Sequence, residues 1–110
     1  MTGTVNCKHF LMGAYIIVEV KIHNQEEYEE YKRLTPGSVD AYGGRFVVRG
    51  GAIESLEGDW NPERIVVLEF PTIERAKEWY HSKGYTAVKK IRHQNATSKM
   101  LLVQGFEPPK

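Results

Sequence analysis

Residues 42–80 read YGGRFVVRGGAIESLEGDWNPERIVVLEFPTIERAKEWY, and this stretch carries the clearest structural pattern of the chain. Two β-branched runs, RFVVR at 45–49 and RIVVLEF at 64–70, are typical of strands. Glycine pairs stand on both sides of the first run, as turns require, and Pro71 closes the second run. Thr72 can then cap an aromatic helix. The stretch therefore predicts two strands followed by a helix.

The same pattern extends towards both ends of the chain. Residues 14–22 (AYIIVEVKI) predict a first strand, and Asn24 with Glu27 forms a capping box for a helix that Pro36 would interrupt. The remaining expected elements are a further helical turn at 37–41, continued strand pairing at 52–57, a loop at 58–62, a helix break at 82–84, a short helix at 85–93 and a last strand at 99–106. The order β-α-β-β-α-β predicts an α+β, ferredoxin-like fold, with a four-stranded antiparallel sheet and helices on one face.

A chain of 110 residues suits a single domain, which we expect at 13–107, between a flexible extension at 1–12 and a short tail at 108–110. A net charge of +1 gives no reason to expect nucleic acid or an anionic membrane as a partner. The chain shows neither a signal-peptide pattern nor a membrane-spanning apolar run, so we expect a cytoplasmic location. Cys7 is the only cysteine, which excludes an internal disulfide.

Strand alternation separates two faces of the expected sheet. Ile16, Val18 and Val20 share an all-aliphatic side of the first strand, which would face the helices. The opposite face, the second face, would hold Tyr15, Ile17, Glu19, Arg45, Val47, Arg49, Ile65, Val67 and Glu69, joined by Gln104 if the last strand has the matching register. Such a mixed face leaves a large apolar patch uncovered, so we expect a second copy of the chain to cover it and its charges to pair there.

Several short motifs resemble one known family. They are Gly13-Ala14-Tyr15, Tyr42-Gly43-Gly44-Arg45-Phe46, Arg49-Gly50-Gly51, Glu57-Gly58-Asp59-Trp60, Pro62, Arg64, Glu69-Phe70-Pro71, Ala76, Trp79-Tyr80 and Tyr85. On these motifs, residues 12–106 resemble the DUF1330 family of uncharacterised proteins, in the dimeric α+β-barrel superfamily. The resemblance implies a ferredoxin-like protomer and a homodimer whose two sheets form a barrel, and it implies no reaction. Superfamily relatives include cofactor-free monooxygenases and lactone isomerases, with pockets between sheet and helices or inside the barrel.

Charged residues of the second face are the first candidates for a site, with Arg45, Arg49 and Glu69 as catalytic groups and Glu19 as a ligand contact. The arginines could clamp a carboxylate or polarise a carbonyl or enolate oxygen. A half-buried glutamate could act as a general base. The alternative is a structural network of ion pairs that holds the dimer together.

Aromatic residues and Arg64 form the second set of candidates, as ligand-binding groups. Trp60 would be the wall and Arg64 the anion anchor of a pocket, or Trp60 would plug the rim of the dimer. Trp79, Tyr80 and Tyr85 would line a pocket between helices and sheet that suits a flat aromatic substrate, or they would simply pack the core.

Histidine spacing shows no metal-ligand pattern, and we expect neither a metal nor a cofactor. The strand at 64–70 lacks the exposed aromatic pair of RNA-binding domains with this strand order. The leading hypothesis is a homodimer that binds a small molecule, with cofactor-independent monooxygenase or isomerase chemistry on a small carbonyl or aromatic compound as its enzymatic form. A non-catalytic ligand-binding protein and a structural or interaction protein are the alternatives.

Overall fold

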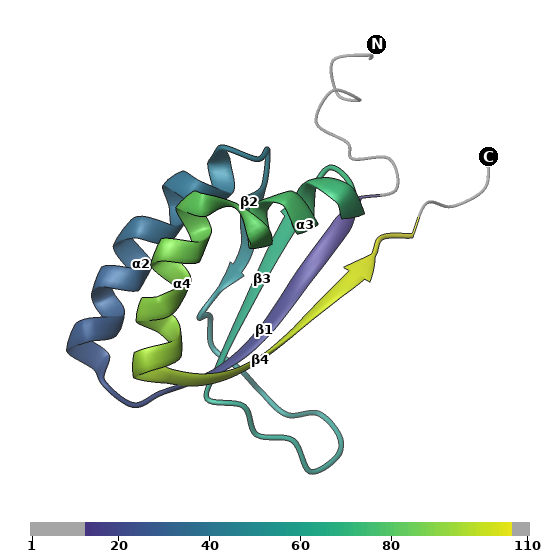
Figure 1. Cartoon of the computed structure of the whole chain (residues 1–110). Helices are drawn as coiled ribbons and strands as arrows, with labels where there is room; N and C mark the ends of the chain where they lie inside the picture. The colour runs from purple at the N-terminus through teal and green to yellow at the C-terminus, as the bar shows by residue number, and fades with distance from the viewer. Residues whose placement is uncertain (1–12, 107–110) are drawn as a thin grey trace.

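The computed structural model describes residues 13–106, in which a layer of helices packs on one sheet (Figure 1). In chain order the elements are β1 (Ala14–Ile22), α2 (Gln25–Asp40), β2 (Arg45–Arg49), β3 (Arg64–Phe70), α3 (Ile73–His81), α4 (Lys83–Asn95) and β4 (Ala96–Gln104). The extension expected at 1–12 and the tail expected at 108–110 lie outside the described residues. None of the helices within 13–106 combines the length and apolar character that a membrane span requires.

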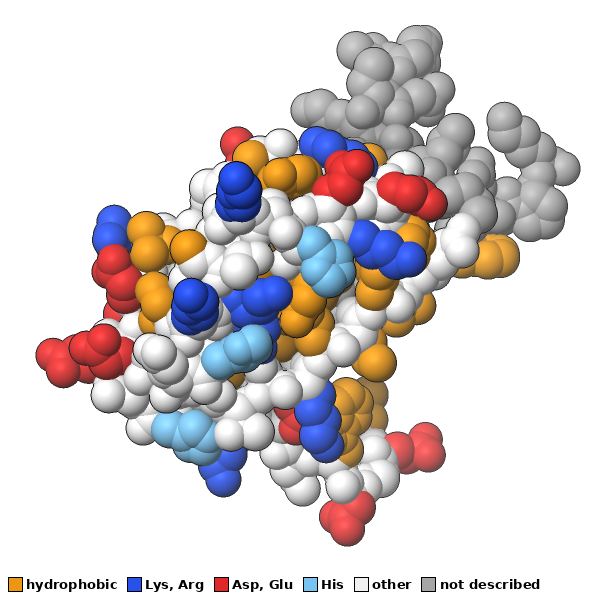
Figure 2. Space-filling view, in the orientation of Figure 1, with side chains coloured by type: hydrophobic (Ala, Val, Ile, Leu, Met, Phe, Trp, Pro, Cys, Tyr) orange, Lys and Arg blue, Asp and Glu red, His pale blue; other side chains and the backbone are white. Residues whose placement is uncertain are grey.

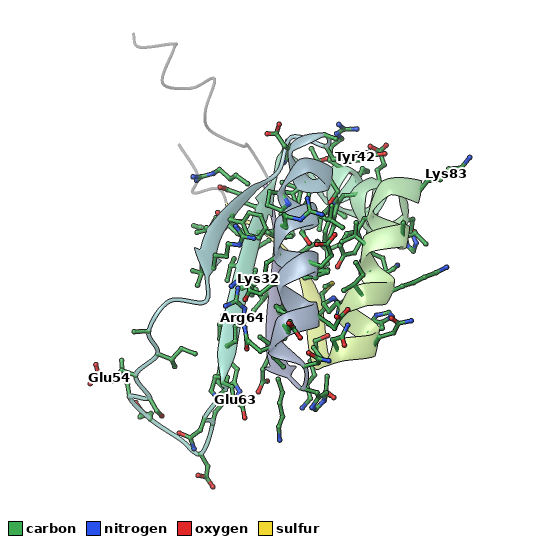
Figure 3. All side chains as sticks on the ribbon, turned by 90° about the vertical axis from the view of Figure 1, so that its left-hand side faces the viewer. Lys32, Tyr42, Glu54, Glu63, Arg64 and Lys83 are labelled. Atoms are coloured by element: carbon green, nitrogen blue, oxygen red, sulfur yellow. The ribbon has the colours of Figure 1, made fainter. Side chains whose placement is uncertain are left out.

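The sheet has the strand order β2-β3-β1-β4, and all its neighbouring strands run antiparallel. The helices α2, α3 and α4 all lie on one face of this sheet, as the side view in Figure 3 shows. Within the described chain, no helix covers the second face. The arrangement confirms the predicted α+β, ferredoxin-like protomer.

The core lies between the helices and the aliphatic side of β1, as the alternation predicts. Ile16, Val18 and Val20 are buried there, together with the large rings of Trp79 and Tyr85. Burial of a large apolar side chain stabilises a fold by about 1.5–3 kcal/mol. The core therefore fixes which face of the sheet the helices cover and leaves the second face free.

Helix α2 continues through Pro36, so the predicted interruption there is wrong. Asn24 caps the helix as expected, because its Oδ1 accepts from Glu27 N at 3.1 Å. Proline has no N–H, so Pro36 leaves the carbonyl of Lys32, four residues earlier, without its helical partner. Arg49 of β2 supplies the missing donor, with Nη2 at 2.5 Å from this oxygen. A tertiary contact thus allows the helix to pass the proline.

Three other expected boundaries differ from the structure. Residues 52–57 lie in an irregular loop, not in a strand. Only Ser82 separates α3 from α4, because its hydroxyl donates to Trp79 O at 2.7 Å and accepts from Tyr85 N at 3.1 Å. One residue therefore ends one helix and begins the next, and α4 is longer than the helix expected at 85–93.

Strand β4 begins at Ala96 rather than at 99, since Ala96 pairs with Ile22 at the far end of β1.

A β-bulge at Val47 changes the faces of β2. Phe46 pairs with Leu68, but Val48 pairs with Val67 and Arg49 with Val66, so the register shifts by one residue. The prediction that Arg49 shares the second face with Arg45 is therefore wrong, because Arg49 lies on the helix side.

The register of β4 also changes which residues lie on the second face. Gln104 pairs with Ala14, whose side chain is fully buried on the helix side, so Gln104 does not join the second face. Leu101 and Val103 pair with Ile17 and Tyr15 and lie on the second face instead.

Candidate functional site

On the second face, Glu69 of β3 is held by one neighbour from each adjacent strand. Arg45 lies across from it on β2, with Nη2 at 2.7 Å and Nε at 2.8 Å from Glu69 Oε1. Tyr15 lies across from it on β1 and donates its hydroxyl to Oε2 at 3.1 Å. This hydrogen bond to a carboxylate raises the pKa of Tyr15. Both oxygens of Glu69 are thus engaged, as in a structural ion-pair network.

Glu19 of β1 contacts the loop that joins β2 to β3. Trp60 Nε1 donates to Glu19 Oε1 at 3.3 Å, while the indole keeps 59% of its surface exposed. Figure 1 shows this loop reaching beyond the end of the sheet. Trp60 and Glu19 therefore form a second contact on the second face, apart from the group around Glu69.

A cavity of about 30 Å³ lies on the other side of the sheet, between β-strands and the helices α2 and α4. We call it the helix-side cavity. Its apolar wall comes from Val18, Val20, Phe46, Val66, Leu68 and Met100, with Trp79 beside them. Its polar wall comes from Tyr28, Tyr31, Lys32, Arg49, Arg64 and Arg92. Of the predicted site residues, the cavity brings Arg49, Arg64 and Trp79 together.

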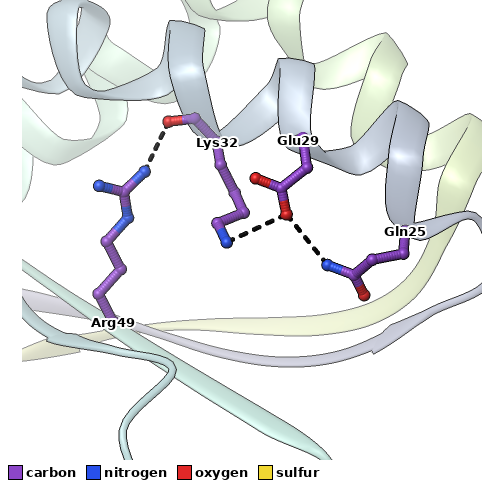
Figure 4. A network of polar contacts seen from close by, with 4 residues as sticks. All are labelled: Gln25, Glu29, Lys32 and Arg49. Atoms are coloured by element: carbon purple, nitrogen blue, oxygen red, sulfur yellow. Dashed lines mark hydrogen bonds and ion pairs between the residues drawn. The ribbon is translucent and has the colours of Figure 1, made fainter.

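Two of these cations, at the α2 side, already have partners (Figure 4). Arg49 donates to the carbonyl of Lys32 and lies 4.5 Å from the centre of the Phe46 ring. Lys32 Nζ lies 3.3 Å from the exposed carboxylate of Glu29, which also accepts from Gln25. Each of these two side chains thus has a polar partner within the protein.

Arg64 begins β3 and lies between the sheet and α2, level with Lys32 in Figure 3. It shares the helix-facing side of β3 with Val66, two residues further on. Gly50 leaves room for its guanidinium, which lies 5.9 Å from the centre of the Tyr28 ring. Its Nε is buried and has no hydrogen-bond partner within residues 13–106. Arg64 therefore brings a positive charge to the cavity and has one buried donor unpaired in the described chain.

Arg92 of α4 is the most deeply buried charge at the cavity, with 4% of its surface exposed. Its Nε donates to the hydroxyl of Tyr85 at 3.3 Å, and its Nη1 donates to Ser98 Oγ. The ring of His93 lies 3.5 Å from Nη2, and burial lowers the pKa of this histidine, with the positive charge of Arg92 adding to the effect. The partners of Arg92 are therefore polar but not anionic.

Two tyrosine hydroxyls meet next to Arg92. Tyr31 and Tyr85 share a hydrogen bond of 2.7 Å, and burial raises the pKa of both phenols. Both therefore remain protonated at neutral pH and can donate or accept hydrogen bonds without acting as bases. The ring of Tyr85 also packs on Trp79, with ring centres 3.9 Å apart.

Trp79, Tyr80 and Tyr85 form one aromatic cluster, as predicted, but of the three it is Trp79 that lines the helix-side cavity. Trp79 is fully buried and donates to Ser38 Oγ at 3.0 Å. Tyr80 turns away, under the ammonium of Lys89 at 3.7 Å, and lines a separate apolar hollow beside β4. Figure 2 shows hydrophobic side chains reaching the surface near this strand. Tyr80 is thus not part of the helix-side cavity.

Arg92 is the most deeply buried charge among the cavity residues that were not proposed as site residues from the sequence, the others including Tyr28, Tyr31, Lys32 and Thr35. Its signal was present, because Arg92 follows Tyr85 by seven residues and therefore lies on the same helix face. A charged residue in line with a buried aromatic residue is unusual enough to mark a candidate site. Among residues 13–106, no three His, Cys, Asp or Glu side chains converge as metal ligands would.

Known structures share this fold at low sequence identity. A protein of unknown function from Rhodopseudomonas palustris is 18% identical, with a TM-score of 0.71 over 96% of this chain and 92% of that one. SnoaB, a cofactor-independent oxygenase from Streptomyces nogalater, is 13% identical, with a TM-score of 0.61 over 89% and 97%. A dimeric ferredoxin-like protein of unknown function from Bacteroides fragilis is 15% identical, with a TM-score of 0.53 over 88% and 100%. At these identities the likeness shows the fold alone.

A comparison with curated proteins found no match. The sequence itself matches the model of a family described as a domain of unknown function, DUF1330, over residues 13–106. This match spans the whole described domain and agrees with the resemblance seen in the sequence motifs. The chain therefore belongs to the DUF1330 family.

Proposed function

We propose that the protein binds a small organic molecule in the helix-side cavity. The observation that carries this proposal is Arg64, which lines an unfilled cavity and whose buried Nε has no hydrogen-bond partner among residues 13–106. Protein interiors are close-packed, and their buried polar groups normally have partners. An unfilled space and an unpaired buried donor each cost free energy. A ligand that fills the space and accepts a hydrogen bond from Arg64 would remove both of these costs.

The second face supports the further proposal that the protein is a homodimer. Leu101 and Val103 keep 63% and 42% of their surfaces exposed, and Val47 and Val48 keep 46% and 37%. An apolar patch of this kind favours burial against a partner. Two copies of the chain can pair this same face about a twofold axis, because each copy presents the same patch to the other. The Bacteroides fragilis protein, which is described as dimeric, is consistent with this.

Cofactor-independent catalysis is the second candidate function. SnoaB shares the fold, and Arg64 and Arg92 could stabilise the enolate oxygen of a carbonyl or aromatic substrate. Such a reaction also needs a base, and the described residues that line the cavity include no carboxylate and no histidine. Glu69, the glutamate predicted as a catalytic group, is engaged on the second face. We therefore favour binding over catalysis.

Native mass spectrometry of the protein purified from cells tests both parts of the proposal. We expect the mass of two chains and a reproducible small-molecule adduct that disappears under denaturing conditions. A monomer at micromolar concentration would contradict the dimer. Absence of an adduct, together with no binding from a set of small acids, amides and alcohols, would contradict the ligand site.

A further inference from the structure

Resting on the proposed function, we infer that the ligand is a compact carboxylate with a short apolar body, whose negative group binds to Arg64 and Arg92. The helix-side cavity joins two kinds of wall, one cationic and one aliphatic. The cationic wall determines the charge that a ligand should carry, and the aliphatic wall determines which part of it should be apolar.

The cationic wall lacks a matching negative charge. Arg49, Arg64, Arg92 and Lys32 line the cavity, and no acidic side chain of the described chain lines it with them. The exposed carboxylate of Glu29 is near and pairs with Lys32. An arginine remains charged in a protein, and burying a charge without a counter-charge is strongly unfavourable. An anionic ligand would provide this counter-charge.

Arg64 and Arg92 are the cations that most need this counter-charge, because Arg92 is buried and Arg64 is half-buried, whereas Arg49 is exposed to solvent. Arg49 donates to the carbonyl that Pro36 leaves free, and Lys32 is in contact with Glu29. Arg64 has a free buried donor, and Arg92 meets only uncharged hydroxyls and an imidazole. A carboxylate can accept hydrogen bonds from more than one guanidinium at once.

The aliphatic wall and the volume define the rest of the ligand. Val18, Leu68 and Met100 can contact hydrocarbon but cannot bond to polar oxygens. One water needs about 10–15 Å³ on this scale, so a cavity of about 30 Å³ holds two or three waters and limits the ligand to the shortest carboxylates. Inorganic phosphate has no apolar part to place against this wall. The geometry therefore favours a small organic acid over a free phosphate.

Thermal unfolding with isosteric probes tests this inference. Sodium propionate, propionamide and sodium phosphate are compared at equal concentration, with sodium chloride added to hold ionic strength constant. We expect propionate to raise the melting temperature clearly more than propionamide or phosphate at low millimolar concentration, because a ligand that binds the native state stabilises it there, whereas an excluded salt acts only at much higher concentration. The amide has almost the same shape as the acid and lacks its charge.

Two variants assign the effect to the cavity. We expect Arg64→Gln to weaken propionate binding by at least about tenfold, because charge-assisted hydrogen bonds are lost. Arg64→Lys, which keeps the charge, should restore part of the binding. Arg33→Gln is the matched control, because Arg33 lies exposed on α2 and pairs with Glu30. The control should bind propionate like the unmodified protein.

The outcomes separate this inference from the proposed function. Equal stabilisation by propionate and propionamide, or unchanged propionate binding in Arg64→Gln, would overturn the anionic ligand and leave small-molecule binding intact. Stronger stabilisation by phosphate than by propionate would overturn the carboxylate class. No stabilisation by any probe, with no adduct in the native mass spectrum, would overturn both.

Discussion

Gly50 lies beside the guanidinium of Arg64, where the chain leaves β2. Its φ of +71° is one that L side chains rarely adopt, and a Cβ at this residue would collide with Arg64. We expect Gly50→Ala to lower the free energy of unfolding by about 1–3 kcal/mol, because it combines backbone strain with displacement of the half-buried Arg64 guanidinium. Urea unfolding measures the change.

Gly51 is the matched control for this substitution. It is the next residue in the chain, and a Cβ there would meet no atom within 4 Å. Gly51→Ala should change the free energy of unfolding by less than about 0.5 kcal/mol. Similar values for the two variants would show that Gly50 has no special role in positioning Arg64.

The paired phenols of Tyr31 and Tyr85 predict how stability depends on alkaline pH. Burial raises their pKa in the folded protein, whereas a phenol of the unfolded chain loses its proton near pH 10. Above about pH 10 the folded state then binds more protons than the unfolded state, so stability falls as pH rises. Tyr31→Phe should make this fall less steep, as urea unfolding between about pH 8 and 11 can show. Equal steepness in both proteins would mean that the buried phenol of Tyr31 does not cause the loss of stability.

At the scale of elements, α2 and β2 are coupled through Pro36, Lys32 and Arg49. The guanidinium of Arg49 replaces the N–H that Pro36 lacks at the carbonyl of Lys32. We expect Arg49→Gln to lower the free energy of unfolding by about 0.5–2 kcal/mol, because it removes this hydrogen bond at an exposed position where water can partly replace the donor. The same substitution should cost much less in a Pro36→Ala background, where the alanine supplies a backbone N–H that can bond to the carbonyl.

A double-mutant cycle by urea unfolding measures this coupling. We expect an interaction energy of about 0.5–2 kcal/mol between the two sites, which is the range for residues that share a partner. Additive effects of the two substitutions would mean that Arg49 does not compensate for the proline.

The elements show what the sequence could and could not predict. The bounds of β1, β2 and β3 follow from their β-branched runs and the prolines and glycines around them, and the structure confirms them. The path of α2 through Pro36 depends on Arg49, which is distant in sequence, so local patterns cannot reveal it. The bulge at Val47 has no glycine to mark it, and it alone moved Arg49 to the helix side.

The candidate site was predictable in part for the same reasons. Arg64 and Trp79 line the cavity, and both were proposed as ligand contacts from residue type and position. Arg45 and Glu69 form an ion pair, as the structural alternative for these residues describes. That Arg64 and Arg92 line the same cavity could not be foreseen, because it depends on how β3 and α4 pack in three dimensions.

For the whole molecule, the second face is the proposed interface of the homodimer. Leu101 lies on this face with 63% of its surface exposed, so its side chain would be buried in the proposed homodimer. Leu101→Glu would place a charge without a partner in this interface. We expect the variant to be a folded monomer at concentrations where the unmodified protein is a dimer, as sedimentation equilibrium can measure.

Lys90→Glu is the control for the assembly. Lys90 is exposed on α4, on the face of the molecule opposite to Leu101, so this variant should remain a dimer. Loss of the dimer in both variants would point to the helices as the interface. A monomeric unmodified protein would contradict the homodimer itself.

A crystal structure determined in the presence of sodium propionate tests the central claim most directly. We predict density for propionate in the helix-side cavity, with carboxylate oxygens at about 3 Å from the guanidinium nitrogens of Arg64 and Arg92. The ethyl group should point towards Val18, Leu68 and Met100. An empty cavity at saturating propionate, with a carboxylate of the chain itself bound to both arginines, would contradict the claim.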